Sequence, residues 1–212
     1  GSITFDGRDL SPNHYTDKKS KQQYEKMIQD IRGNEISMIF QDPMSYLNPI
    51  VTIEKQMTEG IISHTKCSKK EAVARAVELM KMVGIPAPES RLKQYPFEFS
   101  GGMRQRIIIA IALANNPKLL IADEPTTALD VTVQAQILDL IKDLTKKMNA
   151  GVILITHDLG VVASLCDRIS IMYGGNIMEE GTVNEIFYEA KHPYTKGLLN
   201  SIANSNVDNR EP

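Results

Sequence analysis

Hydrophobic residues along this chain fall into two kinds of pattern, short continuous runs and longer stretches with helical spacing. The short runs predict strands at residues 35–40, 119–122 and 151–156. The longer stretches predict helices at residues 72–83, 103–114 and 131–148. Strands that alternate with helices predict an α/β domain with a mainly parallel sheet. The run at 151–156 is continuous and apolar, which is typical of a strand covered on both faces of such a sheet.

Local signals predict the remaining elements. Residues 2–5 alternate like a strand and precede a turn at residues 6–7, so the chain is predicted to open with a hairpin fragment. Residues 52–95 predict a mostly helical lobe with a capping box at residues 68–71. Two further strands are predicted at 168–173 and 176–179, and two short helices at 183–188 and from 192 to about 203.

Composition and charge exclude several classes of protein. The chain has 212 residues, 42% hydrophobic residues and a formal net charge of -2, so it lacks a general attraction for nucleic acid or anionic lipid. Residues 11–32 are polar and predict a loop and a helix at 21–31. Basic residues there alternate with Glu25 and Asp30, which favours a solvated face over a nucleic-acid patch.

The sequence shows no membrane span and no signal peptide. No window holds the roughly 18 to 20 continuous apolar residues that a span needs. A role at a membrane is therefore expected to depend on a partner. Cys67 and Cys166 lie far apart in the sequence, which favours two structural thiols in a reduced compartment over a disulfide framework or a zinc site.

Three small residues, Ser100, Gly101 and Gly102, open the predicted helix at 103–114. A helix start exposes unpaired N–H groups and the positive end of the helix dipole, and small side chains leave them accessible. Such a site suits a phosphate-sized anion. A Gly-Gly pair before a helix is, however, usually only a turn, so the pattern alone does not establish a ligand site.

Two adjacent carboxylates, Asp123 and Glu124, follow the predicted strand at 119–122. They repel each other and are costly to bury. A magnesium ion bound to a triphosphate would relieve this cost, with one carboxylate near the metal and the other near the attacking water. An acidic pair after a strand is more often structural than catalytic, so this hypothesis needs the order and spacing of the surrounding motifs.

The run F-S-G-G-M-R-Q-R, followed by A-D-E-P-T-T-A-L-D-V, resembles the ATP-binding subunits of ABC transporters, most closely those of oligopeptide and dipeptide importers. The resemblance places residues 100–104 at the signature loop, 119–124 at the Walker B strand and 128–130 at the loop that follows. Phe99 and Met103 depart from the commoner Leu and Gln. The resemblance implies a P-loop NTPase-like fold with a helical subdomain.

Two more segments extend the resemblance. The run M-I-F-Q-D-P-M-S-Y-L-N-P at 38–49 resembles the Q-loop, and H-P-Y-T at 192–195 resembles the peptide-importer branch. By residue type alone, Gln41 at a strand end is normally a surface residue, and His157 after a strand is more often structural than functional. The resemblance makes Gln41 a contact to Mg²⁺ and the attacking water, and His157 a contact to the γ-phosphate.

The resemblance also implies a specific role for each residue of the site. Glu124 orients or deprotonates water, with Gln41 and His157 beside it, and Asp123 holds Mg²⁺ together with Gln41. A second ATP-binding subunit supplies Ser100, Gly101 and Gly102 to the ATP, and Asp130 couples the two sites. These are the residues to which the resemblance gives a role: Gln41, Ser100, Gly101, Gly102, Asp123, Glu124, Asp130 and His157.

The resemblance implies partners as well. Integral membrane permease subunits are expected to meet residues 41–49, with the protein on the cytoplasmic face of the membrane. Other subunits are expected to handle the peptide, and no nucleic acid is expected. The predicted parts are a partial ATPase core with the Q-loop at 1–51, a helical subdomain at 52–96, the core with signature, Walker B and switch histidine at 97–182, and a helical tail at 183–212.

One motif of such an ATPase is missing from the sequence. The P-loop reads G-x-x-x-x-G-K-[ST], but none of the 13 glycines here is followed by Lys. The pattern favours a chain that lacks the N-terminal part of the domain, with exposed sheet edges or strand exchange between copies. Two alternatives stay open: a regulatory domain that lacks the P-loop by nature, and a soluble ABC ATPase acting on nucleic acid or ribosomes, which 38–49 and 192–195 disfavour.

We predict that this polypeptide alone binds ATP weakly and shows no significant turnover. The P-loop supplies most of the charge-assisted hydrogen bonds to the phosphates, each contributing roughly 1.5 to 3 kcal/mol. Calorimetric titration with ATP and a phosphate-release assay measure the two quantities. Micromolar affinity, together with hydrolysis that disappears in Glu124→Gln, would contradict the prediction.

Overall fold

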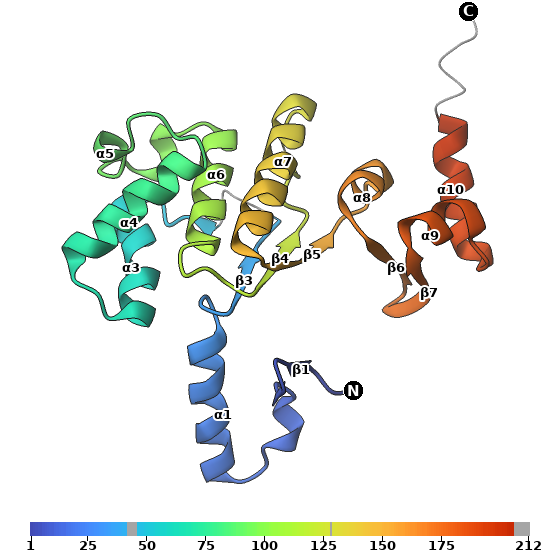
Figure 1. Ribbon diagram of the computed structural model, residues 1–212, viewed down its shortest axis with the longest axis horizontal. Helices are drawn as coiled ribbons and strands as arrows, with labels where there is room; N and C mark the ends of the chain where they lie inside the picture. The colour runs from blue at the N-terminus through green and yellow to red at the C-terminus, as the bar shows by residue number, and fades with distance from the viewer. Residues whose placement is uncertain (42–45, 128, 206–212) are drawn as a thin grey trace, which may run out of the picture. The chain divides into compact units, whose positions relative to one another are not determined.

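In the computed structural model, three strands pair in parallel at the centre of the first part of the chain (Figure 1). They are β3 (Ile36–Ile39), β4 (Leu119–Asp123) and β5 (Gly151–Ile155), in the order β3-β4-β5. In register, Met38 lies beside Ile121 and Ile121 beside Ile153. The predicted α/β arrangement with a parallel sheet is confirmed, and the carboxyl ends of all three strands meet at one edge.

The structure describes residues 1–41, 46–127 and 129–205. It divides the chain into two compact units, Gly1–Ile155 and a second unit that begins at Thr156. The boundary falls inside the segment predicted at 97–182, and the four-part division stays a prediction. Residues 42–45 of the predicted permease-contacting segment and Ala128 of the predicted loop at 128–130 lie outside the described residues.

Helices cover one face of the sheet. The helices α6 (Gly101–Ala112) and α7 (Val131–Met148) share a hydrophobic core with Ile39 and Leu120 of the strands. The helices α3 (Ile53–Thr65) and α4 (Lys69–Met82) belong to the same core. The short segments α5 (Pro88–Arg91) and η2 (Pro96–Glu98) lead from α4 to α6. The predicted helical lobe is therefore packed into the core that supports the sheet.

The helix ends follow the local sequence signals. Ser68 Oγ accepts from the Glu71 N–H at 3.3 Å and Glu71 Oε2 accepts from the Ser68 N–H at 2.8 Å, so the predicted capping box of α4 is confirmed. Gly84, at φ +75°, takes the left-handed conformation after this helix. In α7 the buried positions include Ile137, Leu138 and Ile141, the apolar face predicted from the sequence.

The strand β5 corrects one prediction. Its residues Val152, Ile153 and Ile155 are 42%, 49% and 46% exposed, so the described residues do not cover it on both faces. Within the described residues, β5 is one of the two edge strands of the sheet, with β3 at the other edge. A continuous apolar run shows that a strand can be buried. Whether it is buried depends on other segments of the chain packing against it. The expected exposed sheet edge is present.

The N-terminal part forms a hairpin followed by a polar helix. The strands β1 (Thr4–Phe5) and β2 (Arg8–Asp9) pair antiparallel across the predicted turn, and η1 (Pro12–His14) and α1 (Lys18–Ile31) follow. The helix α1 begins three residues earlier than predicted. The cause is Asp17, whose side chain accepts from the N–H groups of Lys19 and Ser20 and caps the helix.

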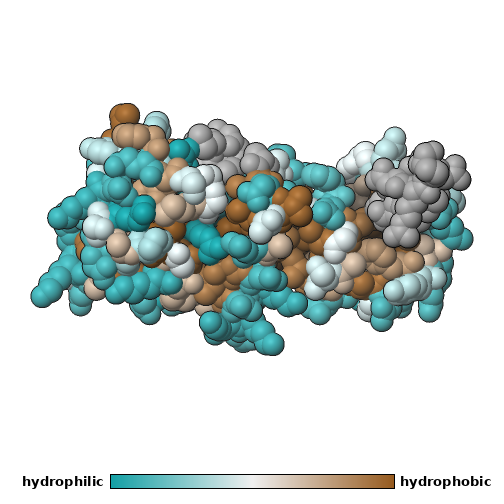
Figure 2. Space-filling view, turned by 90° about the horizontal axis from the view of Figure 1, so that it is seen from above, coloured by the Kyte–Doolittle hydropathy of each residue, from teal (hydrophilic) through white to brown (hydrophobic). Residues whose placement is uncertain are grey.

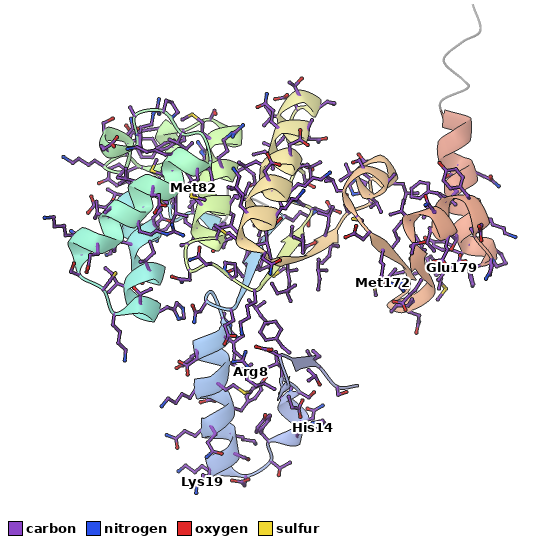
Figure 3. All side chains as sticks on the ribbon, in the orientation of Figure 1. Arg8, His14, Lys19, Met82, Met172 and Glu179 are labelled. Carbon is purple, nitrogen blue, oxygen red and sulfur yellow. The ribbon has the colours of Figure 1, made fainter. Side chains whose placement is uncertain are left out.

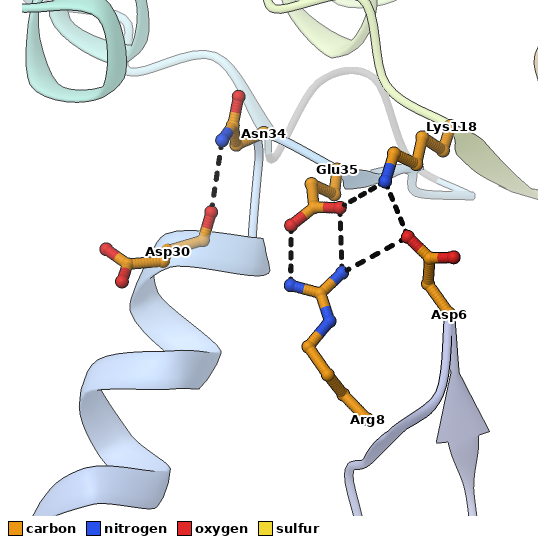
Figure 4. A network of polar contacts seen from close by, with 6 residues as sticks. All are labelled: Asp6, Arg8, Asp30, Asn34, Glu35 and Lys118. Carbon is orange, nitrogen blue, oxygen red and sulfur yellow. Dashed lines mark hydrogen bonds and ion pairs between the residues drawn. The ribbon is translucent and has the colours of Figure 1, made fainter.

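An ion-pair network joins this hairpin to the sheet (Figure 4). Both terminal nitrogens of Arg8 lie 2.7 Å from the oxygens of Glu35, just before β3. Lys118 Nζ, just before β4, lies 3.0 Å from Glu35 Oε2 and 2.6 Å from Asp6 Oδ2. Hydrogen bonds from Arg8 and then Lys118 lower the pKa of Glu35 to about 2.

The second unit has its own small core. The elements are α8 (Leu159–Leu165), β6 (Arg168–Tyr173), β7 (Asn176–Thr182), α9 (Val183–Glu189) and α10 (Pro193–Ser205). The strands β6 and β7 pair antiparallel across the Gly-Gly turn, as predicted. Glu179 of β7, labelled in Figure 3, lies in this second unit. It accepts from the N–H groups of Lys191 at 2.7 Å and His192 at 3.2 Å, which ties the strand to the start of α10.

Hydrophobic surface is not confined to β5. Figure 2 shows hydrophobic areas among hydrophilic residues on the face turned to the viewer. None of the helices formed by the described residues combines the length and apolar character needed to cross a bilayer. Scattered surface hydrophobics of this kind are ordinary in folded proteins.

We predict that Glu35→Gln lowers stability at neutral pH by on the order of 1 kcal/mol, because a partly exposed ion-pair network is weakened. The folded pKa of about 2 lies below the ordinary 4.5, so the stabilisation is full above the ordinary value and is lost as the pH falls toward the folded one. Thermal unfolding across this acid range should show a smaller pH dependence in the variant.

The exposed Glu25 of α1 provides the matched control, since Glu25→Gln removes the same charge outside this network. Identical acid profiles for wild type and Glu35→Gln would show that the network contributes nothing to folding.

Candidate functional site

Glu124 occupies a constrained position directly after β4. Its N–H donates to the carbonyl of Ile155 at 2.9 Å, so its backbone is bonded to the end of the neighbouring strand β5. Its φ of +43° is left-handed, which costs a residue with a Cβ on the order of 1–3 kcal/mol. Backbone strain of this kind concentrates at functional sites, where the surrounding contacts enforce it.

Gln41 reaches this carboxylate from the adjacent strand. It follows β3 by two residues, and its Nε2 donates to Glu124 Oε2 at 2.9 Å. Parallel pairing of β3 with β4 brings the two side chains together although they are 83 residues apart in the sequence. The amide turns its nitrogen toward Glu124 and therefore its oxygen away from that carboxylate.

Thr127 also contacts Glu124, through both its side chain and its backbone. Its Oγ1 donates to Glu124 Oε2 at 2.7 Å, and its N–H donates to the Glu124 carbonyl at 3.1 Å. The same carboxylate oxygen therefore accepts from a hydroxyl and an amide. Sequence reasoning missed Thr127. The signal was its spacing of three residues from Glu124, which joins the two ends of a β-turn.

Ser100, Gly101 and Gly102 begin α6, two residues earlier than the predicted helix start at Met103. Ser100 Oγ accepts from the Met103 N–H at 3.4 Å, and both Ser100 and Gly101 are exposed. The exposed helix start agrees with the accessible N–H groups expected from the sequence. No other described feature tests its role as an anion site.

Gly102 also has a packing role that the sequence did not show. A Cβ added to Gly102 would lie 2.9 Å from Val133 Cγ1, whereas one added to Gly101 would lie 3.7 Å from Leu129 Cδ2. The glycines let the start of α6 approach the start of α7. Asp130 begins this second helix, since its Oδ1 accepts from the Val133 N–H at 3.0 Å.

His157 belongs to the second unit, whereas Gln41, Asp123 and Glu124 belong to the first. It is exposed and stands between the end of β5 and Asp158, which caps α8 as predicted by accepting from the N–H groups of Gly160 and Val161. Within the first unit, the structure brings Gln41 to Glu124. The role of His157 stays a prediction.

The oxygen donors at this edge suit magnesium held together with phosphate. Asp123 ends β4 and lies next to Glu124, and the Gln41 amide adds a further oxygen. The described residues contain no cluster of three His, Cys, Asp or Glu side chains able to hold a metal on their own. Mg²⁺ commonly binds one or two carboxylates and takes its other ligands from phosphates and water, so this donor set fits it.

Two further glutamines hold the turn after Glu124. Gln105 of α6 is 1% exposed, and its Nε2 lies 2.5 Å from the carbonyl oxygen of Pro125. Gln134 of α7 donates to the carbonyls of Leu129 at 3.1 Å and Thr126 at 3.3 Å. The sequence signal for Gln105 was a polar residue at helical spacing from Ile108 and Ala112, on an otherwise apolar helix face.

Comparison with known proteins identifies the family of this chain. The sequence profile described as ABC transporter matches residues 1–127, more than half of the chain. The chain belongs to the ABC transporter family. The resemblance inferred from the signature, Walker B and Q-loop motifs is thereby confirmed, and so is the ABC ATPase fold class.

Relatives within the ABC transporter family are peptide transport components. The oligopeptide transport ATP-binding protein OppD of Bacillus subtilis (strain 168) is 60% identical over 202 residues, which cover 95% of this chain and 54% of the relative. The dipeptide transport ATP-binding protein DppD of the same organism is 53% identical over 211 residues, which cover 60% of that relative. The chain thus spans little more than half the length of these relatives.

Solved structures of ABC ATPases have the same fold. A dimeric post-hydrolysis state of the ATP-binding cassette MJ0796, bound to ADP and Pi, matches with a TM-score of 0.69 and 29% identity, covering 86% of this chain and 73% of the other. The protein cbiO1 from Clostridium perfringens matches with a TM-score of 0.68 and 26% identity, covering 88% of this chain and 67% of the other.

We predict that Gly102→Ala is less stable than Gly101→Ala by about 1–3 kcal/mol, because only the first substitution overpacks the contact between α6 and α7. Both variants gain the same helix propensity, so their difference isolates the clash with Val133. Denaturant unfolding measures it. In a Val133→Ala background the difference should shrink, and a difference that stays the same would show that this contact is not the cause.

Proposed function

We propose that this chain is part of the ATP-hydrolysing subunit of an ABC importer for oligopeptides or dipeptides. The observation that carries the proposal is the hydrogen-bonded group of Gln41, Glu124 and Thr127 at the carboxyl edge of the sheet, beside Asp123. The family membership and the peptide transport relatives support it.

In this proposal Glu124 acts on the attacking water. Its carboxylate orients the water or accepts its proton, and the hydrogen bonds from Gln41 and Thr127 fix the direction of that carboxylate. Asp123 and the oxygen of Gln41 hold Mg²⁺, whose charge offsets that of the ATP phosphates. The two hydrogen bonds from Gln41 and Thr127 orient the carboxylate before ATP arrives.

A second ATP-binding subunit would complete the site. The exposed start of α6, with Ser100, Gly101 and Gly102, would offer its N–H groups to the terminal phosphate of an ATP held by that second subunit. His157 would contact the terminal phosphate of the ATP held by its own subunit, and Asp130 would couple the two sites. The dimeric state of MJ0796 bound to ADP and Pi supports this part of the proposal.

The partners are proposed to be integral membrane permease subunits, with the protein bound peripherally on the cytoplasmic face of the membrane. Residues 41–49 would meet these subunits. Of the described residues there, Tyr46 stacks against Phe40 with ring centroids 5.5 Å apart, and burial raises the pKa of its phenol. The peptide itself would be handled by other subunits.

The test is ATP hydrolysis by the complete gene product that carries this chain, assembled with its membrane subunits. We predict that Glu124→Gln lowers kcat by roughly 10²–10⁴-fold while ATP binding persists, because an amide cannot accept the proton of water. The exposed Glu59 of α3 supplies a control of equal charge change, and Glu59→Gln should hydrolyse normally. Wild-type turnover in Glu124→Gln would refute the proposal.

A further inference from the structure

Two helices hold the turn that follows Glu124 through glutamine amides. Gln105 of α6 donates to the carbonyl of Pro125, and Gln134 of α7 donates to the carbonyls of Thr126 and Leu129. Gln105 is 1% exposed and its Nε2 lies 2.5 Å from its acceptor, so this contact is the closer and more deeply buried one.

We propose that Gln105 is a positioning residue for Glu124. Its amide fixes the peptide after Pro125, this peptide fixes the turn from Glu124 to Thr127, and Thr127 fixes the carboxylate. The catalytic part of this inference rests on the proposed function, whereas the fixing of the turn does not.

Because residue 125 is a proline, the hydrogen bond from Gln105 to its carbonyl can fix the local backbone. The Pro125 ring locks its φ near one value, so the direction of its carbonyl depends on ψ alone. The hydrogen bond from Gln105 sets that one remaining angle. The chain then continues to Thr127, whose N–H bonds the Glu124 carbonyl at 3.1 Å and whose Oγ1 bonds Glu124 Oε2 at 2.7 Å.

The other atom of the same amide shows that core packing alone does not explain Gln105. A carbonyl only accepts hydrogen bonds, so the nitrogen must be the atom facing Pro125. Gln105 Oε1 is then buried, with no hydrogen-bond donor among the described residues. Burying an unpaired acceptor costs free energy. An apolar side chain of equal length would pack beside Ile108 and Ile109 without that cost.

Within one subunit, the contact also links residues that are proposed to serve two different ATP sites. The helix α6 begins at Gly101 and Gly102, and one turn further along it holds the Pro125 carbonyl through Gln105. A displacement of α6 therefore changes the direction of that carbonyl and, through the turn, the position of the Glu124 carboxylate. The helix whose start is proposed to face a phosphate thus also sets the geometry of the proposed base.

The first test is hydrogen exchange of backbone amides in this chain. Gln105→Met keeps the length of the side chain and removes the donor. We expect exchange at the N–H groups of Glu124 and Thr127 to accelerate about tenfold, while the N–H groups of α6 stay protected. Gln136→Met is the matched control, because the Gln136 amide oxygen accepts from Arg106 Nη2 at 3.2 Å instead of holding the turn.

The second test is the rate of ATP hydrolysis by the complete protein. A misplaced carboxylate should lower kcat about ten- to hundredfold and leave KM for ATP unchanged, whereas general destabilisation would not separate the two constants. Should Gln105→Met fail to fold, Gln134→Met tests the same turn from α7 and should accelerate exchange at Thr127.

The outcomes separate the two proposals. Unchanged exchange at Glu124 and Thr127 in a folded Gln105→Met protein overturns the positioning role. Equal losses in kcat and in affinity for ATP overturn it as well. Faster exchange in a protein whose wild type hydrolyses no ATP refutes the proposed function, and the fixing of the turn by Gln105 stands.

Discussion

Parallel pairing of β4 with both of its neighbours is the constraint on which the rest of the first unit depends. It brings the ends of three strands to one edge, so that Gln41 after β3 meets Glu124 after β4, and the Glu124 N–H meets the Ile155 carbonyl of β5. Each of these residues is distant from the others in sequence. A shift of β4 by one residue would break both contacts, because it would turn the Glu124 side chain to the other face and move its N–H away from the Ile155 carbonyl.

The sheet alone leaves the turn after Glu124 undetermined, and the helices supply what is missing. The left-handed backbone at Glu124 costs on the order of 1–3 kcal/mol, so it persists only because several contacts enforce it. Those contacts come from β5, from Thr127 and from the amide of Gln105 on α6. Gly102 contributes indirectly by letting α6 lie against Val133 of α7.

Sequence patterns predicted the positions of helices and strands well, but predicted poorly which residues and elements contact one another. The helix at 131–148 and the capping box at 68–71 depend on local periodicity and local hydrogen bonds, which a sequence displays directly. The contacts of Thr127 and Gln105 depend on where the chain turns and which helix packs against the turn, and the local signals for these residues do not specify those partners. The exposure of β5 was missed for the same reason, because the sequence of an apolar strand does not show which elements cover it.

The contact of this site that is most open to disruption is the one between Glu124 and β5. The Glu124 N–H is bonded to β5, and within the described residues β5 is one of the two edge strands of the sheet and its most exposed strand. Edge strands open more readily than central ones because they have fewer hydrogen bonds and fewer buried contacts. Anything that pairs with β5 or covers Ile153 binds the folded state and stabilises it by mass action. Coverage of this strand therefore strengthens the anchor of Glu124 without touching the carboxylate.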